Sequence, residues 1–124
     1  MGRLTRFVAS PTEELLAAGK AVLRYLKGTS TLGLCYSGDS GLTGFCDAVF
    51  AAYRDTQWSS SAVVYLYGGS ARCWSSKLQP SVAALTTEAE YIAAAVAAKE
   101  GTWLRHLRVF VTKETGSMAL LCDS

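Results

Sequence analysis

Hydrophobic side chains recur at helical spacing near the start of the chain. The pattern begins after Ser10-Pro11-Thr12-Glu13, which supplies a capping hydroxyl, a proline suited to a first helical turn and a glutamate three residues after the cap. A glycine that follows Lys27 marks the end of the pattern. We therefore predict a helix over residues 11–27, capped by Ser10, with these residues on its apolar side: Leu15, Leu16, Val22, Leu23 and Leu26.

The next part of the chain consists of short runs rich in aromatic and β-branched residues, separated by glycine and serine. Two glycines, Gly68-Gly69, lie between the last two runs, and glycine accepts the positive φ of a tight hairpin turn without steric cost. The last two runs are therefore expected to pair antiparallel. The runs predict these strands: 31–36, 42–48, 61–67 and 71–76.

A second helical pattern covers residues 87–108, with Thr86 or Thr87 as its cap. Small residues let this helix lie close against a sheet, and larger ones fill the remaining space. The small residues are Ala94, Ala97 and Gly101, and the larger ones are Ile92, Val96, Trp103 and Leu107. Met118 to Cys122 is predicted as a final strand, reached by the kind of helical crossover that parallel strands use.

The order of these elements predicts one α/β unit, a mixed sheet with packed helices. Of the 124 residues, 50% are hydrophobic and 18% are charged, so the chain has the material for a core. The net charge of +2 permits a polyanionic partner without requiring one.

Four cysteines occur singly in apolar runs, and a single histidine, His106, accompanies them, which disfavours a zinc site. We interpret the cysteines as buried free thiols of a reducing compartment. No stretch has the length and apolarity of a membrane span or of a signal peptide. The expected location is therefore intracellular, in the cytoplasm or nucleus, with no secretion and no membrane partner.

Three acids occupy places where chemistry is plausible. Asp47 ends an apolar strand, Glu90 lies in the first turn of the long helix and Asp123 ends the last strand. Carboxylates at strand ends suit a hard cation such as Mg²⁺. Structural roles explain them as well, since Asp47 and Asp123 fit turn positions and Glu90 fits a capping box beginning at Thr87. Spacing alone favours these structural roles over a metal site, because short patterns often match by chance.

Several segments together resemble the ribonuclease H region of copia-type retrotransposon Pol polyproteins. Upstream, Ser10-Pro11-Thr12-Glu13 and Val22 to Thr29 resemble the stretch that joins reverse transcriptase to that region. The segments within the ribonuclease H region are Gly44-Phe45-Cys46-Asp47-Ala48, Trp74-Ser75-Ser76-Lys77-Leu78-Gln79, Thr86 to Ala93, Ala98-Lys99-Glu100 and Trp103-Leu104. The resemblance spans roughly residues 4–124 in the family's order, which is more specific than any single motif.

The resemblance implies a ribonuclease H fold that hydrolyses the RNA strand of an RNA–DNA hybrid. It assigns Asp47, Glu90 and Asp123 as catalytic residues that hold two Mg²⁺ ions, with Mn²⁺ as the substitute cation, and it implies the reverse transcriptase region of the same polyprotein as a partner. Glu88 and Glu90 point about 200° apart around a helix, so one of them faces the strand of Asp47. We choose Glu90 because it shares a face with the small residues, and leave Glu88 on the solvent side.

Comparison with the family also divides the chain and limits the expected activity. Residues 1–30 correspond to the connecting helical segment, and residues 31–124 to a ribonuclease H-like domain that is incomplete at its C-terminus. Family domains continue past Ser124 into a region that supplies a fourth metal ligand. Val49-Phe50 also replace the family's usual second aspartate. The alternative is therefore a catalytically inactive, truncated remnant that acts as a nucleic-acid or protein binding module.

Other polar and aromatic residues receive weaker assignments. The hydroxyl-rich Ser59-Ser60-Ser61, Arg54 and Ser75-Ser76-Lys77 are candidates for contacts with the phosphates or 2′-hydroxyls of a hybrid, with solvated loops as the simpler interpretation. His106 is given no catalytic role. The tryptophans Trp58, Trp74 and Trp103 are interpreted as core or edge packing rather than as stacking platforms for bases.

Overall fold

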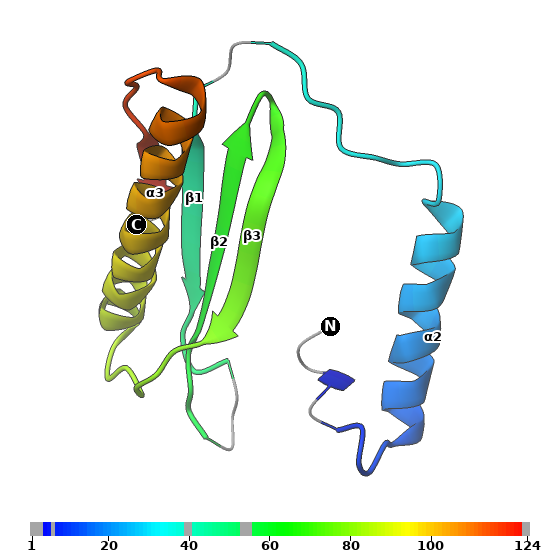
Figure 1. Cartoon of the computed structure of the whole chain (residues 1–124). Helices are drawn as coiled ribbons and strands as arrows, with labels where there is room; N and C mark the ends of the chain where they lie inside the picture. Colours follow the sequence, from blue (N-terminus) through cyan, green and yellow to red (C-terminus); the bar gives the residue numbers. More distant parts are fainter. Residues whose placement is uncertain (1–3, 6, 39–40, 53–55, 123–124) are drawn as a thin grey trace. The chain divides into compact units, whose positions relative to one another are not determined.

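The structure, a computed structural model, describes residues 4–5, 7–38, 41–52 and 56–122 (Figure 1). The chain divides into two compact units, Met1–Leu34 and Cys35–Ser124. The first unit contains helix α2 (Glu13–Gly28). The second contains, in chain order, β1 (Thr43–Val49), β2 (Ser60–Tyr67), β3 (Ser70–Leu78), α3 (Thr86–Thr112) and β4 (Ala119–Cys122).

Helix α2 begins two residues later than the sequence predicts. Its N-cap is Thr12, whose hydroxyl accepts a hydrogen bond of 3.4 Å from the Leu15 amide, so the assignment of Ser10 as the cap is wrong. The residue before a proline is biased toward extended backbone, which explains why the helix starts after Pro11. None of its residues is buried, and Leu23 is 67% exposed.

The predicted strand at residues 31–36 does not form. Single groups of this segment instead hydrogen bond to the β2–β3 hairpin: the Tyr36 hydroxyl donates to the Ala71 carbonyl at 2.8 Å, and the Ser70 hydroxyl donates to the Cys35 carbonyl. A strand needs a regular backbone ladder and a buried face. Both Leu32 and Leu34 are exposed, so this segment has no buried face.

The four strands form one mixed sheet in the order β3-β2-β1-β4. The β1–β2 and β2–β3 pairs are antiparallel, and the latter turns at Gly68 and Gly69, with φ of 62° and 79°, as their sequence predicts. The pair of β1 with β4 is parallel, as expected for strands joined by a helical crossover. This α/β architecture is the one that the ribonuclease H resemblance implies.

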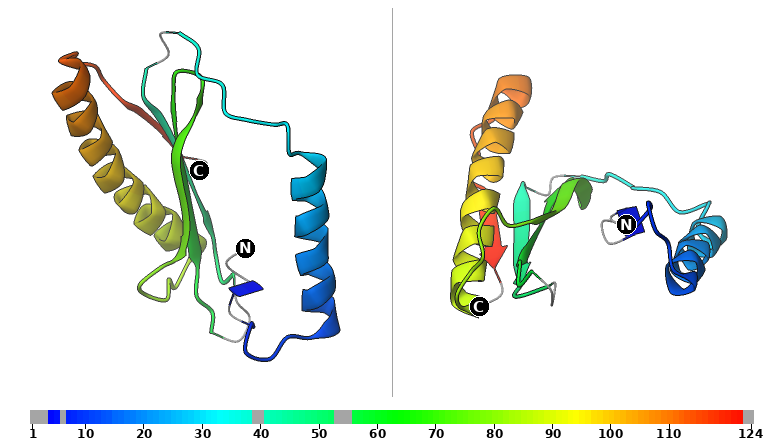
Figure 2. Two further views of the ribbon diagram at one scale, coloured as in Figure 1. Left: turned by 45° about the vertical axis from the view of Figure 1, so that its right-hand side comes forward. Right: turned by 90° about the horizontal axis from the view of Figure 1, so that it is seen from below.

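Helix α3 covers one face of the sheet (Figure 2). It runs from Thr86 to Thr112, beyond the predicted 87–108, and ends where Lys113 adopts φ of 61° and its amide donates to Val109. Neither threonine caps its start. The N-cap is Leu85, which has no side-chain capping bond, while the Glu88 carboxylate accepts a hydrogen bond of 2.6 Å from the Ala84 amide.

Tyr65 is the centre of the core between α3 and the sheet. It is fully buried, and its hydroxyl donates to the Ala97 carbonyl on α3. Two glycines make space for it: a Cβ on Gly44 would lie 2.5 Å from the Tyr65 ring, and one on Gly101 would lie 2.9 Å from the Tyr65 hydroxyl. The buried residues of α3 are Ala89, Ala93, Ala97 and Gly101, and Ala94 is partly buried against the core, so the prediction that Ala94, Ala97 and Gly101 face the sheet is confirmed.

Of the four larger residues assigned to this layer, Ile92 is half-buried and the other three are exposed. Trp103 is 63% exposed, Leu107 43% and Val96 38%, because the close approach of a small-residue face leaves no room for them beside the sheet. Leu104 and Met118 pack against the core in their place.

The opposite face of the sheet carries an apolar row. Register pairs Trp74 with Val64, Val64 with Phe45, and Phe45 with Leu121, so the four side chains lie on one face, away from the buried face that α3 covers. Trp74 is 66% exposed and Leu121 52% exposed, so Trp74 is not a core residue, and it lies on the edge strand β3, the second of the two positions predicted for it.

Candidate functional site

Asp47 lies near the C-terminal end of β1. Its neighbour Cys46 is buried, and side chains alternate along a strand, so Asp47 points to the opposite, open face together with Phe45. One of its carboxylate oxygens, Oδ1, accepts a hydrogen bond of 2.7 Å from the Ala48 amide. The side chain is exposed. The carboxylate is therefore held at the strand end and remains accessible to solvent.

Strand β4 brings a second strand end next to that of β1. The two strands are parallel, and Cys46 pairs directly with Cys122. In the sequence, Asp47 follows the first cysteine and Asp123 follows the second. Asp123 itself lies outside the described residues, so its assignment stays a prediction.

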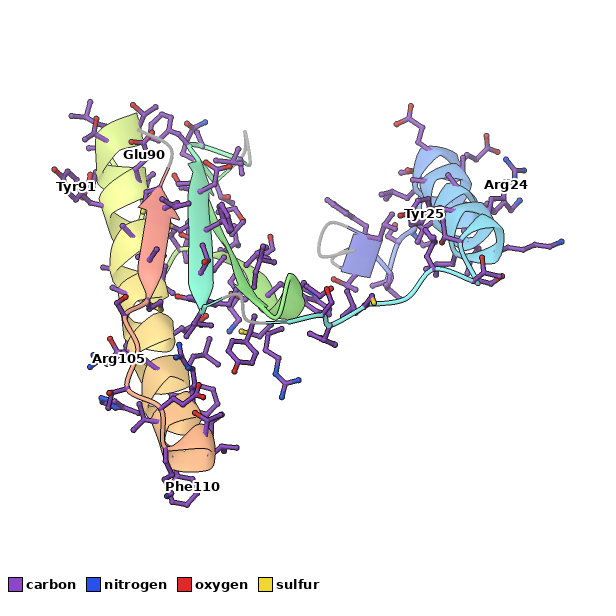
Figure 3. All side chains as sticks on the ribbon, turned by 90° about the horizontal axis from the view of Figure 1, so that it is seen from above. Arg24, Tyr25, Glu90, Tyr91, Arg105 and Phe110 are labelled. Atoms are coloured by element: carbon purple, nitrogen blue, oxygen red, sulfur yellow. The ribbon has the colours of Figure 1, made fainter. Side chains whose placement is uncertain are left out.

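Glu90 comes from the N-terminal part of α3, which lies at the same end of the sheet as the β1 arrowhead (Figure 1). It is half-buried and directly follows Ala89, which is fully buried against the sheet. Figure 3 shows Glu90 on the first turns of α3, at the opposite end from Arg105 and Phe110. Glu88 is exposed, in agreement with its expected solvent-side position.

Gln79 joins β2 to α3, the helix that carries Glu90. Its side chain is 2% exposed, and its amide nitrogen donates to the Ser61 hydroxyl on β2 at 2.9 Å and to the Ala89 carbonyl on α3 at 2.7 Å. Its backbone amide donates to the Ser59 carbonyl at 2.9 Å. Since Ala89 precedes Glu90 and Ser61 pairs with Ala48, Gln79 ties the helical turn of Glu90 to the sheet beside Asp47.

Gln79 ends one of the segments that resemble the family, and no role is predicted for it from the sequence. Its position between Leu78 and Pro80, where the strand ends, is the signal that was available. The Oε1 atom of Gln79 has no hydrogen-bond donor among the described residues, so the side chain is held through its nitrogen alone.

The serines near this end serve the structure. Ser59 and Ser61 are buried, and the Ser59 hydroxyl accepts a hydrogen bond of 3.2 Å from the Ala51 amide. Their proposed contact with hybrid phosphates is therefore wrong. Ser76 is exposed and pairs with Ala62, which pairs with Asp47, so Ser76 and Asp47 share a face and a row of the sheet. Arg54 lies outside the described residues.

The thiols near the site are poor metal ligands. Burial, followed by the neighbouring Cys122, raises the pKa of Cys46 to about 12, and a metal ligand must be a thiolate. The described cysteines are free, but Cys35 and Cys122 are exposed, so the prediction that all four thiols are buried is wrong for these two.

Within the described ranges, no group of three acidic, histidine or cysteine side chains is close enough to hold a metal ion. Asp47 and Glu90 fit Mg²⁺ in donor type, since carboxylate oxygens are its usual protein ligands. They are two of the three predicted ligands, but Asp47 points to the open face of the sheet, whereas Glu90 lies on α3, which covers the other face. Among the helices of the described part of the chain, none has the length and apolarity needed to cross a membrane.

Comparisons with known proteins identify relatives over most of the chain. The retrovirus-related Pol polyprotein from transposon TNT 1-94 of Nicotiana tabacum is 40% identical over 125 residues, which is 100% of this chain and 9% of that protein. The retrovirus-related Pol polyprotein from transposon RE1 of Arabidopsis thaliana is 36% identical over 84% of this chain and 7% of that protein. The chain thus spans less than a tenth of the length of these polyproteins.

A shorter relative matches over most of its own length. Secreted RxLR effector protein 161 of Plasmopara viticola is 37% identical over 84% of this chain and 75% of that protein. No protein-family model and no solved structure matches the chain. The chain therefore belongs to one sequence family with the Plasmopara viticola protein and with this region of the retrovirus-related Pol polyproteins, and it has a retrotransposon Pol origin.

Proposed function

We propose that the second unit is a ribonuclease H-like domain of a copia-type element that hydrolyses the RNA strand of an RNA–DNA hybrid with Mg²⁺ or Mn²⁺. One observation carries the proposal: the parallel register of Cys46 with Cys122 places the ends of β1 and β4 side by side, at the end of the sheet where α3 begins. Asp47 and Asp123 follow the paired cysteines in the sequence, and Glu90 follows the helix start.

Asp47 comes from β1, Glu90 comes from α3, and Asp123 follows β4 in the sequence, a distribution that suits a site for two cations. Two bound Mg²⁺ ions would supply an activated water and stabilise the leaving oxygen. In this proposal Asp47 and Glu90 hold the cations and Asp123 is the third ligand. The exposed carboxylate of Asp47 leaves the strand end open to a large substrate, which a nucleic-acid duplex requires.

Gln79 acts in this proposal as a positioning residue. The distance between a strand and a helix is set by their packing, and two-metal chemistry is sensitive to small displacements of its ligands. The two hydrogen bonds from the Gln79 nitrogen fix the turn of Ala89 relative to Ser61. The helical turn that carries Glu90 is thereby held in place against β2, the strand that pairs with the strand of Asp47.

The partners follow from the same assignment. The RNA–DNA hybrid is the substrate, and Ser76, exposed in the same row as Asp47, is placed to meet its backbone. The second partner is the reverse transcriptase region of a Pol polyprotein, which would deliver the hybrid.

The test is a cleavage assay on a labelled RNA–DNA hybrid with Mg²⁺ and with EDTA. We expect Asp47→Asn and Glu90→Gln each to lower the rate about 100-fold or more, because each removes a charged oxygen ligand. Glu88→Gln is the matched control, since Glu88 lies two residues from Glu90 on the solvent side, and it should keep the rate within about twofold.

The outcomes separate the two candidate functions. Hybrid binding without cleavage, unchanged in Asp47→Asn, would establish the inactive binding remnant. Cleavage that persists in EDTA, or in both carboxylate variants, would refute the proposal.

A further inference from the structure

A cavity lies at the end of the second unit remote from Asp47 and Glu90. It has a volume of about 470 Å³, within the range of small-molecule sites. Its walls come from the segment around Tyr36, the hairpin turn at Gly68 and the C-terminal half of α3. Thr43, at the start of β1, pairs with Leu66 near this turn. Asp47 lies towards the other end of β1, where it pairs with Ala62. The cavity is thus separate from the candidate catalytic end.

The lining of this cavity combines apolar walls with two cations. Leu42, Leu104 and Leu107 supply apolar surface, Arg72 and Arg108 supply positive charge, and no acidic residue is among the lining residues that the structure describes. Such a lining matches a ligand that has an anionic head and an apolar body.

Arg108 is the least satisfied group of this lining. Its side chain is 17% exposed, and its Nε atom is buried without a hydrogen-bond acceptor among the described residues. The guanidinium lies 5.9 Å from the centre of the Tyr67 ring and packs on the backbone of Gly116. Among the described residues it forms an ion pair at 4.0 Å with Glu114, whose side chain is 69% exposed.

The Arg108 guanidinium is desolvated and weakly paired, which favours the binding of an anion. Burial removes most of its water, and the distant, exposed Glu114 compensates little of the charge. Contacts with Tyr67 and Gly116 fix the plane of the guanidinium, so a ligand would lose little entropy in ordering it. Arg72 is exposed and also lines the cavity, where it adds a second positive charge from β3.

We propose that this cavity binds a small amphipathic organic anion, whose carboxylate or phosphate is held by Arg108 and Arg72 and whose hydrocarbon portion lies against Leu42, Leu104 and Leu107. The site is independent of hybrid cleavage, because it shares no residue with the carboxylate end of the sheet.

The test uses the full 124-residue chain and three probes below their micelle-forming concentrations: decanoate, decyl phosphate and decanol. Binding is followed by two-dimensional NMR of the backbone amides. We expect shift changes around Tyr36, Gly68 and Leu107, and affinity for at least one anion about tenfold or more above that for decanol, because charged hydrogen bonds to guanidinium are strong. The preferred anion distinguishes a carboxylate ligand from a phosphate ligand.

Variants locate the charge that matters. Arg108→Met should reduce anion affinity to the level of decanol, and Arg72→Gln should weaken it by a smaller factor. Arg105→Gln is the matched control on the same helix, because Arg105 does not line this cavity (Figure 3). Asp47→Asn should leave binding unchanged, which keeps the result separate from that of the cleavage assay.

Three results would overturn the inference: equal affinity for decanol and both anions, shift changes confined to the open face of the sheet, or unchanged anion binding in Arg108→Met. If Arg108→Met loses the dispersed NMR spectrum of the folded chain, Arg72→Gln decides, since Arg72 is exposed and its replacement leaves the packing intact. Anion affinity equal to that of the unmodified chain would then refute the role of the cations.

Discussion

Gly101 offers a direct measurement of how tightly α3 lies against the sheet. A Cβ at this position would lie 2.5 Å from Met118 Cε and 2.9 Å from the Tyr65 hydroxyl. Met118 has a flexible side chain and can move, but Tyr65 is fully buried and bonded to Ala97. Adding one methyl to such a core costs about 1–3 kcal/mol.

An opposing term must be subtracted. Replacing glycine by alanine inside a helix stabilises it by about 1 kcal/mol through backbone entropy. We therefore expect Gly101→Ala to lower the free energy of unfolding by about 0–2 kcal/mol. Gly101→Val should lower it by about 2–4 kcal/mol, since it adds two more methyl groups and a β-branched side chain.

Ala98→Gly calibrates the helix term in the same element. Ala98 is exposed on α3, so this variant should lose about 1 kcal/mol through propensity alone. The assay is urea unfolding followed by tryptophan fluorescence, because Trp58, Trp74 and Trp103 all belong to the second unit. If Gly101→Ala gains the stability that Ala98→Gly loses, the close packing inferred at Tyr65 is wrong.

Three further predictions concern other parts of the chain. Gln79→Glu should lower the free energy of unfolding by about 3–5 kcal/mol at pH 8, because a buried carboxylate would face the Ala89 carbonyl. Urea unfolding should show partial recovery of that stability at pH 5, where the protonated acid can donate a hydrogen bond. A loss of stability that does not depend on pH would contradict this. Burial, more than the nearby Glu100, raises the pKa of Tyr65 from 10.0 to about 12. The neutral phenol therefore contributes about 2–3 kcal/mol to stability. This contribution is complete below pH 10 and is lost as the pH rises through 12. Alkaline unfolding monitored by fluorescence checks this, and Tyr65→Phe should remove that part of the pH dependence. Thr12→Ala should reduce the helicity of α2, measured by circular dichroism, by an amount equivalent to about 1 kcal/mol, while Ser10→Ala should change nothing.

The sequence predicts the sheet of the second unit well where local chemistry decides the structure. Gly68-Gly69 specifies the hairpin because its backbone needs positive φ at both positions, and the alanine-rich pattern specifies α3. The parallel pairing of β1 with β4 follows from the helix between them. Each of these features depends on residues close together in the sequence or on a general rule of chain connection.

The errors occur where tertiary contacts decide. Residues 31–36 have the composition of a strand, but Cys35 and Tyr36 make isolated hydrogen bonds with the hairpin instead of a ladder. Trp103 has the hydrophobicity of a core residue, yet the glycine and alanines of α3 bring the backbone too near the sheet for it. The cap at Leu85 replaces the expected threonines because Glu88 bonds to the backbone before the helix.

For the candidate site, the acids were recognisable from the family resemblance, whereas Gln79 was not. Carboxylates at strand and helix ends have a recognisable chemistry in a sequence. A glutamine that joins Ser61 to Ala89 has none, because its role depends on two partners that come together in the folded unit. The assignment of Asp123 stays a prediction.

The order of the strands has a consequence for the time course of folding. β1 is an inner strand, and one of its edges is completed by β4, whose Leu120 pairs with Gly44 more than seventy residues earlier in the chain. A hairpin of β1 and β2 forms from near neighbours, but closure of so long a loop is slow and depends on α3 being in place. During synthesis, the β1 edge beside Asp47 therefore stays unpaired until the four-residue strand emerges, and in that interval it is the part of the sheet most exposed to pairing with another chain.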